Sequence, residues 1–362
     1  MKNTKTVKSR AKRKNKVKER VLLHKKNRPL LITSIVFLGI TLIAATYAWF
    51  STNLNVKVKT FNMIVTKNSG LQISFDAINY DNYVEISRET LINNLKNTYP
   101  NNTSQWAAMG LTPVSTLGVR DSNKSKFEIY SSAGVMYRNK NQKNGFVNTK
   151  LLTEKGIYPY SSFIAFDLFV KNDTGSPVDD NLFLDFGTEV TIDDGETEEM
   201  QGLVNSTRIG FVKVGSASLD TDYRTIQNLS CNNNCRSIIF EPNSRIHTNM
   251  SKEKAKEYGI NLKDGEKFPT YAYKKAGGPI YVKDTVSGSS AMDMNYFEEQ
   301  QTITDTEFDT PLFSIPNGVT KMRVYVWIEG QDIDSLETDS SGAELAISIN
   351  FIKDTTGYTS FN

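Results

Sequence analysis

The hydrophobic positions along the chain follow two different patterns on either side of residue 50. From Leu30 to Phe50 they form an almost continuous apolar run, and no Asp, Glu, Lys or Arg occurs between Pro29 and Val56. A helix of about 20 residues, rising about 1.5 Å per residue, spans the roughly 30 Å hydrocarbon core of a bilayer. The pattern therefore predicts one transmembrane or signal-anchor helix over residues 29–50.

After this run, apolar positions alternate with polar ones, which is typical of a half-buried β-strand. The apolar face changes phase by one position at Thr60, and such a slip predicts a β-bulge or a change of sheet. The apolar side chains of this predicted strand are Leu54, Val56, Val58, Phe61, Met63 and Val65.

Most of the later chain also has strand character. The segment at residues 163–172, "FIAFDLFVKN", is apolar on both faces around a single acid, and residues 323–329 and 344–351 alternate strictly. Strands whose two faces differ, separated by connections short enough for hairpins, predict two antiparallel sheets packed face to face. We therefore predict a mainly β protein, an antiparallel β-sandwich of jelly-roll-like form over residues 51–362. Helical and loop insertions are expected between about residues 80 and 160 and between about 241 and 310.

Two short helices are expected within these insertions. In "SRETLINNLKNTYP", Ser87 is the predicted N-cap and Pro100 ends the helix. In "SKEKAKEYG", Ser251 is the predicted N-cap and Gly259 suits the left-handed C-terminal end. Neither helix is long enough to build a helical bundle.

The charge distribution predicts the orientation of the membrane segment. The first 28 residues hold thirteen Lys or Arg and one acid, whereas the rest of the chain has more acids than bases. Basic residues beside a membrane helix remain in the cytoplasm, so residues 51–362 are expected outside the cell. The basic tail has no aromatic or glycine-rich interruptions that would stack bases, and we do not expect it to bind nucleic acid.

The chain has two cysteines, Cys231 and Cys235, both in the predicted extracellular part. In an oxidising compartment such a pair most simply forms a local disulfide, with free thiols as the alternative. A zinc site needs about four nitrogen or sulfur ligands. His247 is the single histidine after the membrane segment, so a zinc site lacks ligands.

Catalytic motifs are missing from the sequence. Neither a GxSxG nucleophile motif, an HExxH motif nor a Gly-rich phosphate loop occurs. Paired carboxylates, which suffice for a glycosidase, are the enzymatic alternative. The acids cluster at residues 192–200 and 330–344, and we interpret both runs as solvated loops. We therefore expect a protein without enzymatic activity.

The acidic runs also raise a calcium hypothesis, because hard cations bind several oxygens close together. The side chains concerned are Asp193, Asp194 and Glu196 in one run, and Asp332 and Asp334 in the other. Neither run matches the twelve-residue helix-loop-helix pattern, since Leu336 takes a position that should supply oxygen. No cofactor is expected, and a structural calcium is the alternative.

Frequent aromatic residues suggest a second alternative, a sugar-binding face that includes Trp106 and Trp327. In a sandwich, however, aromatic residues at alternating strand positions usually belong to the core.

The stretch "ATYAWFSTN" resembles the start of the TasA and camelysin family of Gram-positive surface and biofilm-matrix proteins. Members of this family have an oily segment that ends in small residues, followed by Thr, an aromatic or Leu, Ala, one or two aromatics and a polar pair. Residues 46–52 of this chain follow that order, and "VKVKTFNMIV" with "GLQISFDA" is similar to the family's first strands.

The resemblance implies an exported jelly-roll subunit that a signal peptidase trims between Ala48 and Trp49. It also implies polymerisation, in which residues 54–65 complete the sheet of a neighbouring copy. A sheet edge that lacks a strand has unpaired backbone groups, and an alternating segment can satisfy them. Some members are classed as metallopeptidases, but this chain lacks a zinc site, so that activity is not carried over. The basic region and the oily run both exceed those of an ordinary signal peptide, which favours a retained anchor instead.

Together these observations predict a non-enzymatic cell-surface structural protein, either anchored in the membrane or a subunit of a surface or matrix fibre. The expected partners are the membrane, a signal peptidase, and further copies or other surface proteins. The alternative function is a surface binding module, an adhesin or a binder of glycan or wall polymer.

Overall fold

The chain is described here from a computed structural model, in which the predicted membrane segment is not among the described residues. All described residues belong to the unit Ala48–Asn362, one of two into which the chain divides. The basic tail, the 29–50 helix and the predicted cleavage bond after Ala48 lie outside them. Within the described part of the chain, no helix has both the length and the apolar character needed to cross a membrane. The structure describes residues 57–66, 70–107, 110–120, 125–138, 145–154, 162–192, 198–231, 235–257, 263, 265, 281–284, 292–293, 302–330, 332–335 and 343–354.

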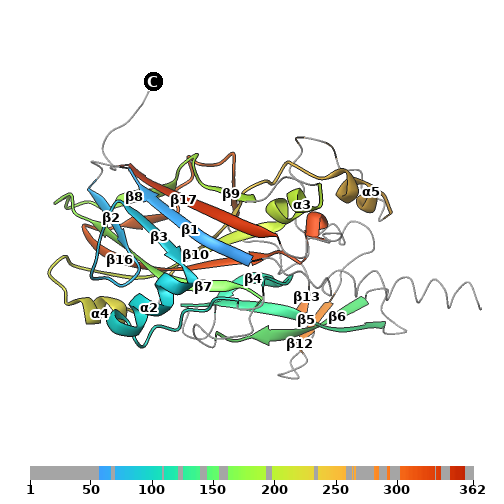
Figure 1. The fold of residues 1–362 in the computed structure, drawn as a ribbon, viewed down its shortest axis with the longest axis horizontal. Helices are drawn as coiled ribbons and strands as arrows, with labels where there is room; N and C mark the ends of the chain where they lie inside the picture. Colours follow the sequence, from blue (N-terminus) through green and yellow to red (C-terminus); the bar gives the residue numbers. More distant parts are fainter. Residues whose placement is uncertain are drawn as a thin grey trace, which may run out of the picture. The chain divides into compact units, whose positions relative to one another are not determined.

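The first sheet contains both the earliest and the last described strands (Figure 1). Its order is β15-β8-β17-β1-β3, and β9 pairs with β17 beside β8. The outermost described strand on one side, β3, pairs antiparallel with β1. The strands are β1 (Lys57–Val65), β3 (Tyr83–Ser87), β8 (Asp180–Leu184), β9 (Glu189–Ile192), β15 (Phe313–Ile315) and β17 (Glu344–Asp354).

The second sheet has the order β14-β11-β10-β16-β7-β2. Its centre is β16, which pairs antiparallel with β10 on one side and with β7 on the other. The strands are β2 (Leu71–Ser74), β7 (Ile164–Asn172), β10 (Thr207–Ala217), β11 (Ser237–Glu241), β14 (Thr302–Thr304) and β16 (Gly318–Ile328).

These two sheets pack face to face over one large hydrophobic core. Phe61 of the first sheet meets Phe166 of the second at 5.3 Å between ring centroids, and Phe351 meets Phe211 at 6.0 Å. Buried side chains at alternate positions of β1, β17, β10 and β16 line the same core. The predicted β-sandwich is therefore present.

A third sheet lies against the other face of the second sheet and forms a smaller core with it. Gly210 of β10 makes room for it, because a Cβ there would lie 2.5 Å from the Phe127 ring. The Phe127 ring also packs on Tyr325 at 5.0 Å and on Trp327 at 6.2 Å. The sheet order is β13-β12-β6-β5-β4. The strands are β4 (Ser115–Arg120), β5 (Phe127–Arg138), β6 (Gly145–Leu152), β12 (Tyr281–Asp284) and β13 (Met292–Asp293).

This third sheet corrects part of the prediction of helical and loop insertions between residues 80 and 160, because β4, β5 and β6 lie between residues 115 and 152. The alternation along β5 is interrupted by small polar residues, and its pairing with β6 shifts register between Ser132 and Met136. An interrupted pattern gives no clear period, so the sequence did not reveal this strand. The prediction of antiparallel sheets holds for most strand pairs of the described residues, but β1 pairs parallel with β17, β14 with β11 and β12 with β6.

The helices are short, as predicted. Helix α2 (Arg88–Thr98) is capped by Ser87, whose hydroxyl accepts from Thr90 N at 3.0 Å, and it ends before Pro100. Helix α5 (Asn249–Glu257) begins earlier than expected, because the Thr248 hydroxyl, not Ser251, is the cap and accepts from Ser251 N at 3.0 Å. The other described helices are α3 (Glu198–Ser206), α4 (Tyr223–Gln227) and the 3₁₀ turn η2 (Ile333–Ser335).

Replacing Phe61 by Ala should lower the free energy of unfolding by about 3–5 kcal/mol, because a fully buried ring between the two sheets leaves a cavity. Ile64 is on the same strand but is 39% exposed. Ile64→Ala should therefore change stability by less than about 1 kcal/mol. Urea denaturation of both variants is the measurement. Equal losses for the two variants would contradict the assignment of β1 to the sandwich core.

Candidate functional site

The predicted donor strand lies within its own domain in this structure. Strand β1 is hydrogen-bonded on both sides, parallel to β17 and antiparallel to β3. A register shift against β17 falls between Val58 and Thr60, where the apolar phase changes in the sequence. Leu54 and Val56 lie outside the described residues. The other four predicted core positions, Val58, Phe61, Met63 and Val65, are all buried.

Aromatic packing fixes the position of β1 in the sandwich. The Phe61 ring meets Trp106 edge-on at 5.4 Å, in addition to its contact with Phe166. Lys57 N donates to Ala343 O at 3.0 Å where β17 begins. The strand that follows the predicted membrane segment is therefore part of the core and not an outer addition to it.

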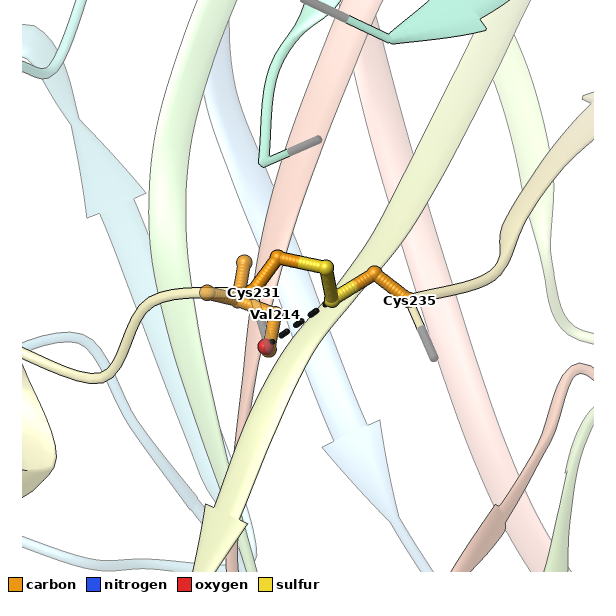
Figure 2. Close-up of a disulfide and its surroundings, with 3 residues drawn as sticks. All are labelled: Val214, Cys231 and Cys235. Atoms are coloured by element: carbon orange, nitrogen blue, oxygen red, sulfur yellow. Dashed lines mark hydrogen bonds between the residues drawn. A yellow bond between two sulfur atoms is a disulfide. The ribbon is translucent and has the colours of Figure 1, made fainter. Parts of the chain in front are cut away.

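A disulfide joins Cys231 and Cys235 in this structure (Figure 2). The Cys235 sulfur lies 3.1 Å from the carbonyl oxygen of Val214 on β10. The bond closes a short loop directly before β11, and its Cys235 end contacts the second sheet. No described cysteine is a free thiol.

Strand β16 carries two kinds of side chain, and both are buried. Its apolar residues, such as Val324 and Val326, face the sandwich core. Alternate residues on the opposite face are polar or aromatic, yet they are also enclosed. These are Lys321, Arg323, Tyr325 and Trp327.

Arg323 lies between two buried carboxylates. Its Nη1 donates to Asp167 Oδ1 at 2.7 Å, and its Nε and Nη2 contact the two oxygens of Glu154. Lys321 Nζ lies 3.2 Å from Asp167 Oδ2, and Tyr99 donates to that same oxygen at 2.8 Å. These five side chains form what we call the Arg323 network.

The Arg323 network joins segments that are far apart in the sequence. Arg323 and Lys321 come from β16 and Asp167 from β7, whereas Tyr99 follows α2 and Glu154 follows β6. The network therefore ties the second sheet both to the helix and to the third sheet.

Electrostatics holds these carboxylates in their charged forms. Burial alone would raise the pKa of Asp167, but Arg323 and Lys321 outweigh it and lower that pKa to about 2. Burial likewise opposes ionisation of Glu154, yet Arg323 keeps its pKa below the ordinary value. Burial and the charge of Asp167 raise the pKa of Tyr99, so its hydroxyl remains protonated and continues to donate.

A second buried cluster lies where α3 leads into β10. Arg208 is fully buried, and its Nη2 donates to Glu241 Oε1 at 2.8 Å and also to Asp332. Asp334 contacts His247 Nδ1 at 2.8 Å. Burial raises the pKa of Asp332, against the attraction of Arg208 and with added repulsion from Asp334.

This second cluster, made of Arg208, Glu241, Asp332, Asp334 and His247, is called the Arg208 cluster. It corrects the interpretation of a solvated loop for the described residues 332–335 of the run at 330–344. Asp332 and Asp334 are buried because Arg208 and His247 supply partners within the domain. The alternative calcium ligands Asp193, Asp194 and Glu196 lie outside the described residues. In the part of the chain that is described, no group of three His, Cys, Asp or Glu side chains is arranged to hold a metal ion.

The two tryptophans considered for a sugar-binding face are in the interior. Trp106 packs on Phe61 in the sandwich core, and Trp327 packs on Phe127 between the second and third sheets. Their exposed fractions are 3% and 0%. Neither ring is available to stack on a sugar at the surface.

The sequence contains one signal for the Arg323 network. Asp167 stands alone in the otherwise apolar segment "FIAFDLFVKN", and a lone acid in a strand buried on both faces requires a cation. The identity of that cation depends on the register between β7 and β16, in which Asp167 lies opposite Arg323. Register between distant strands is not visible in a single sequence.

Comparisons with protein-family models, curated proteins and solved structures find no match for this chain.

Replacing Arg323 by Met should destabilise the domain by about 3–5 kcal/mol at pH 7, because it leaves Glu154 and Asp167 buried without their main cation. The pKa of Asp167 is about 2 in the folded state against 3.8 ordinarily, so the stability it contributes is complete above about pH 4 and is lost as the pH falls towards 2. The difference in the free energy of unfolding between wild type and variant should therefore become smaller as the pH falls from about 4 to 2. Urea denaturation at a series of pH values measures it.

Arg224→Met is the matched control, since the Arg224 side chain is exposed and contacts Tyr223. It should change stability by less than about 1 kcal/mol at every pH. A similar profile for both variants would contradict the role assigned to the Arg323 network.

Proposed function

We propose that this chain is a non-enzymatic cell-surface structural protein, either anchored in the membrane or a subunit of a surface or matrix fibre. The observation that carries the proposal is the position of β1. The strand that follows the predicted membrane segment is an interior strand of the first sheet, between β17 and β3. In the sequence, the predicted anchor at residues 29–50 ends shortly before β1.

The same position supports assembly by strand exchange. A strand paired on both sides leaves two rows of backbone groups unsatisfied when it is removed, and an identical strand from a neighbour can satisfy both. The alternating buried side chains of β1 would make such an exchange specific, because a shift by one residue turns every apolar group outward. The resemblance to the TasA and camelysin family points to the same mechanism.

A jelly-roll-like connectivity is part of the proposal. Consecutive strands repeatedly change sheet, as in β1, β2 and β3, in β14, β15 and β16, and again from β16 to β17. Chain paths that alternate between two sheets in this way are typical of jelly rolls.

The buried charges favour a structural over a catalytic role. Arg323 and Arg208 each contact two carboxylates of the same domain. A catalytic acid or base must instead reach a substrate. The proposal places the domain outside the cell, with the membrane, a signal peptidase acting after Ala48, and further copies as its partners.

Strand exchange is tested by cysteines at a pair of β1 and β17 positions on the outer face of the first sheet. Ile64 lies opposite Asn350 in the register. Cells producing both an Ile64→Cys chain and an Asn350→Cys chain should form a disulfide between chains, because β1 of one copy then lies beside β17 of another. Non-reducing gels of surface material, with N-terminal sequencing, are the measurement.

Ser348→Cys is the matched control for Asn350→Cys, since Ser348 lies opposite Asn62 instead. A cross-linked dimer with an N-terminus at Trp49 supports the fibre subunit. Monomers that retain Met1 in the membrane fraction support the anchored form. Recovery of the chain in the cytosolic fraction would contradict the proposed function in both forms.

A further inference from the structure

A buried lysine, asparagine and aspartate meet where the two sheets of the sandwich come together. Lys353 is on β17 and Asp180 begins β8, both in the first sheet, whereas Asn172 ends β7 in the second. Asn172 and Asp180 are each 1% exposed, and the Lys353 side chain is 5% exposed. We call these three residues the Lys353 cluster.

Hydrogen bonds define the orientation of the Asn172 amide. Its Oδ1 accepts from Lys353 Nζ at 2.9 Å. Its Nδ2 donates to Asp180 Oδ2 at 2.9 Å and to Pro316 O at 3.3 Å. Lys353 donates to the amide oxygen, whereas Asp180 and the Pro316 carbonyl accept from the amide nitrogen. The amide carbonyl is therefore turned towards the lysine amine.

One carboxylate oxygen contacts both nitrogen atoms. Asp180 Oδ2 lies 3.2 Å from Lys353 Nζ and 2.9 Å from Asn172 Nδ2, and it also accepts from Thr174 Oγ1 at 3.4 Å. A group in this position can take a proton from the first nitrogen and deliver it to the second, which is general base and then general acid catalysis.

Two apolar side chains lie beside the Lys353 cluster in the first sheet. Lys353 lies opposite Leu182 in the register, and Asp180 lies opposite Ile315. Both of these side chains are fully buried. Enclosure of this kind excludes water from the three groups.

We propose that Lys353 and Asn172 form an intramolecular isopeptide bond, with Asp180 as the catalytic residue. Asp180 takes a proton from Lys353 Nζ, the amine attacks Cγ of Asn172, and a new carbon–nitrogen bond forms. Asp180 passes that proton to Nδ2 and accepts the second proton that Nζ loses, the original bond from Cγ to Nδ2 breaks, and ammonia leaves. One amide replaces another, so the step needs no oxidant, reductant or added reactant, and the enclosed site holds the reacting groups in position.

The bond would join the two sheets covalently through strands that are far apart in the sequence. Asn172 and Lys353 are 181 positions apart, so the bond closes a long loop. Closing a long loop constrains the unfolded chain more than closing a short one, such as that of the Cys231–Cys235 disulfide. The proposal rests on the Lys353 cluster alone and is independent of the proposed function.

Peptide mapping of the full-length wild-type chain tests the bond, whether or not the N-terminus is trimmed. After reduction and trypsin digestion, residues 172–208 should be recovered joined to residues 324–362, because trypsin does not cleave after an acylated Lys353. The joined species should weigh less than the sum of its two peptides by one ammonia, about 17 Da. Recovery of an unmodified 172–208 peptide together with a peptide that ends at Lys353 would overturn the proposal. Recovery of a 172–208 peptide in which Asn172 has been hydrolysed to Asp would also overturn it.

Variants separate the chemistry from the fold. Lys353→Arg keeps a positive charge, and Asp180→Ala removes the catalytic carboxylate, so neither should give the joined peptide. Asp179→Ala, at the adjacent exposed acid, is the matched control and should give it in full. The melting temperature of Lys353→Arg should be lower than that of Asp179→Ala by about 10 °C. A joined peptide in the Asp180→Ala variant would overturn the role of Asp180.

Discussion

The burial of β16 on both faces is the constraint on which the rest of the structure depends. On one face its valines and isoleucine complete the sandwich core, and that face needs only apolar neighbours. The other face presents Lys321 and Arg323, which cannot be enclosed without carboxylates. Asp167 on β7 and Glu154 after β6 supply these carboxylates, and the third sheet covers this face of β16. The domain therefore has three layers, and its outer layer is fixed by ion pairs as well as by aromatic contacts.

Sequence reasoning worked where one face of a strand had a clear period. It predicted the strand character of β1, the phase change before Phe61 and the cap at Ser87, because each depends on residues close together in the chain. It missed the third sheet, where small polar residues interrupt the alternation of β5. It also missed every buried charge pair, since the partner of Asp167 is 156 positions away and is set by strand register.

The same limit explains the error over Asp332 and Asp334. A run of acids resembles a solvated loop when its counter-ions are unknown, and Arg208 lies in a distant strand. The Lys353 cluster is the extreme case. Its members are ordinary surface residue types at strand ends, and only the packing of the two sheets brings them together in an apolar setting. The proposed bond formation needs residues that are distant in the sequence. A motif of neighbouring residues therefore cannot reveal it, and only the fold does.

Three features of the domain suit a protein that must resist force at a cell surface. Strand β1, which follows the predicted anchor in the sequence, lies inside a sheet, the Arg323 network holds the third layer, and the Lys353 cluster is placed to join the two sheets of the sandwich. Under the proposed function and with the proposed bond, the domain would carry load through its N-terminal strand and could not be fully extended.

Pulling single molecules between residue 57 and the C-terminus tests this account most directly. A bond between Asn172 and Lys353, which are 181 positions apart, shields the chain between them from the force, so the wild-type chain should extend about 600 Å less on unfolding than the Lys353→Arg variant. Equal extensions for the two chains would contradict the account.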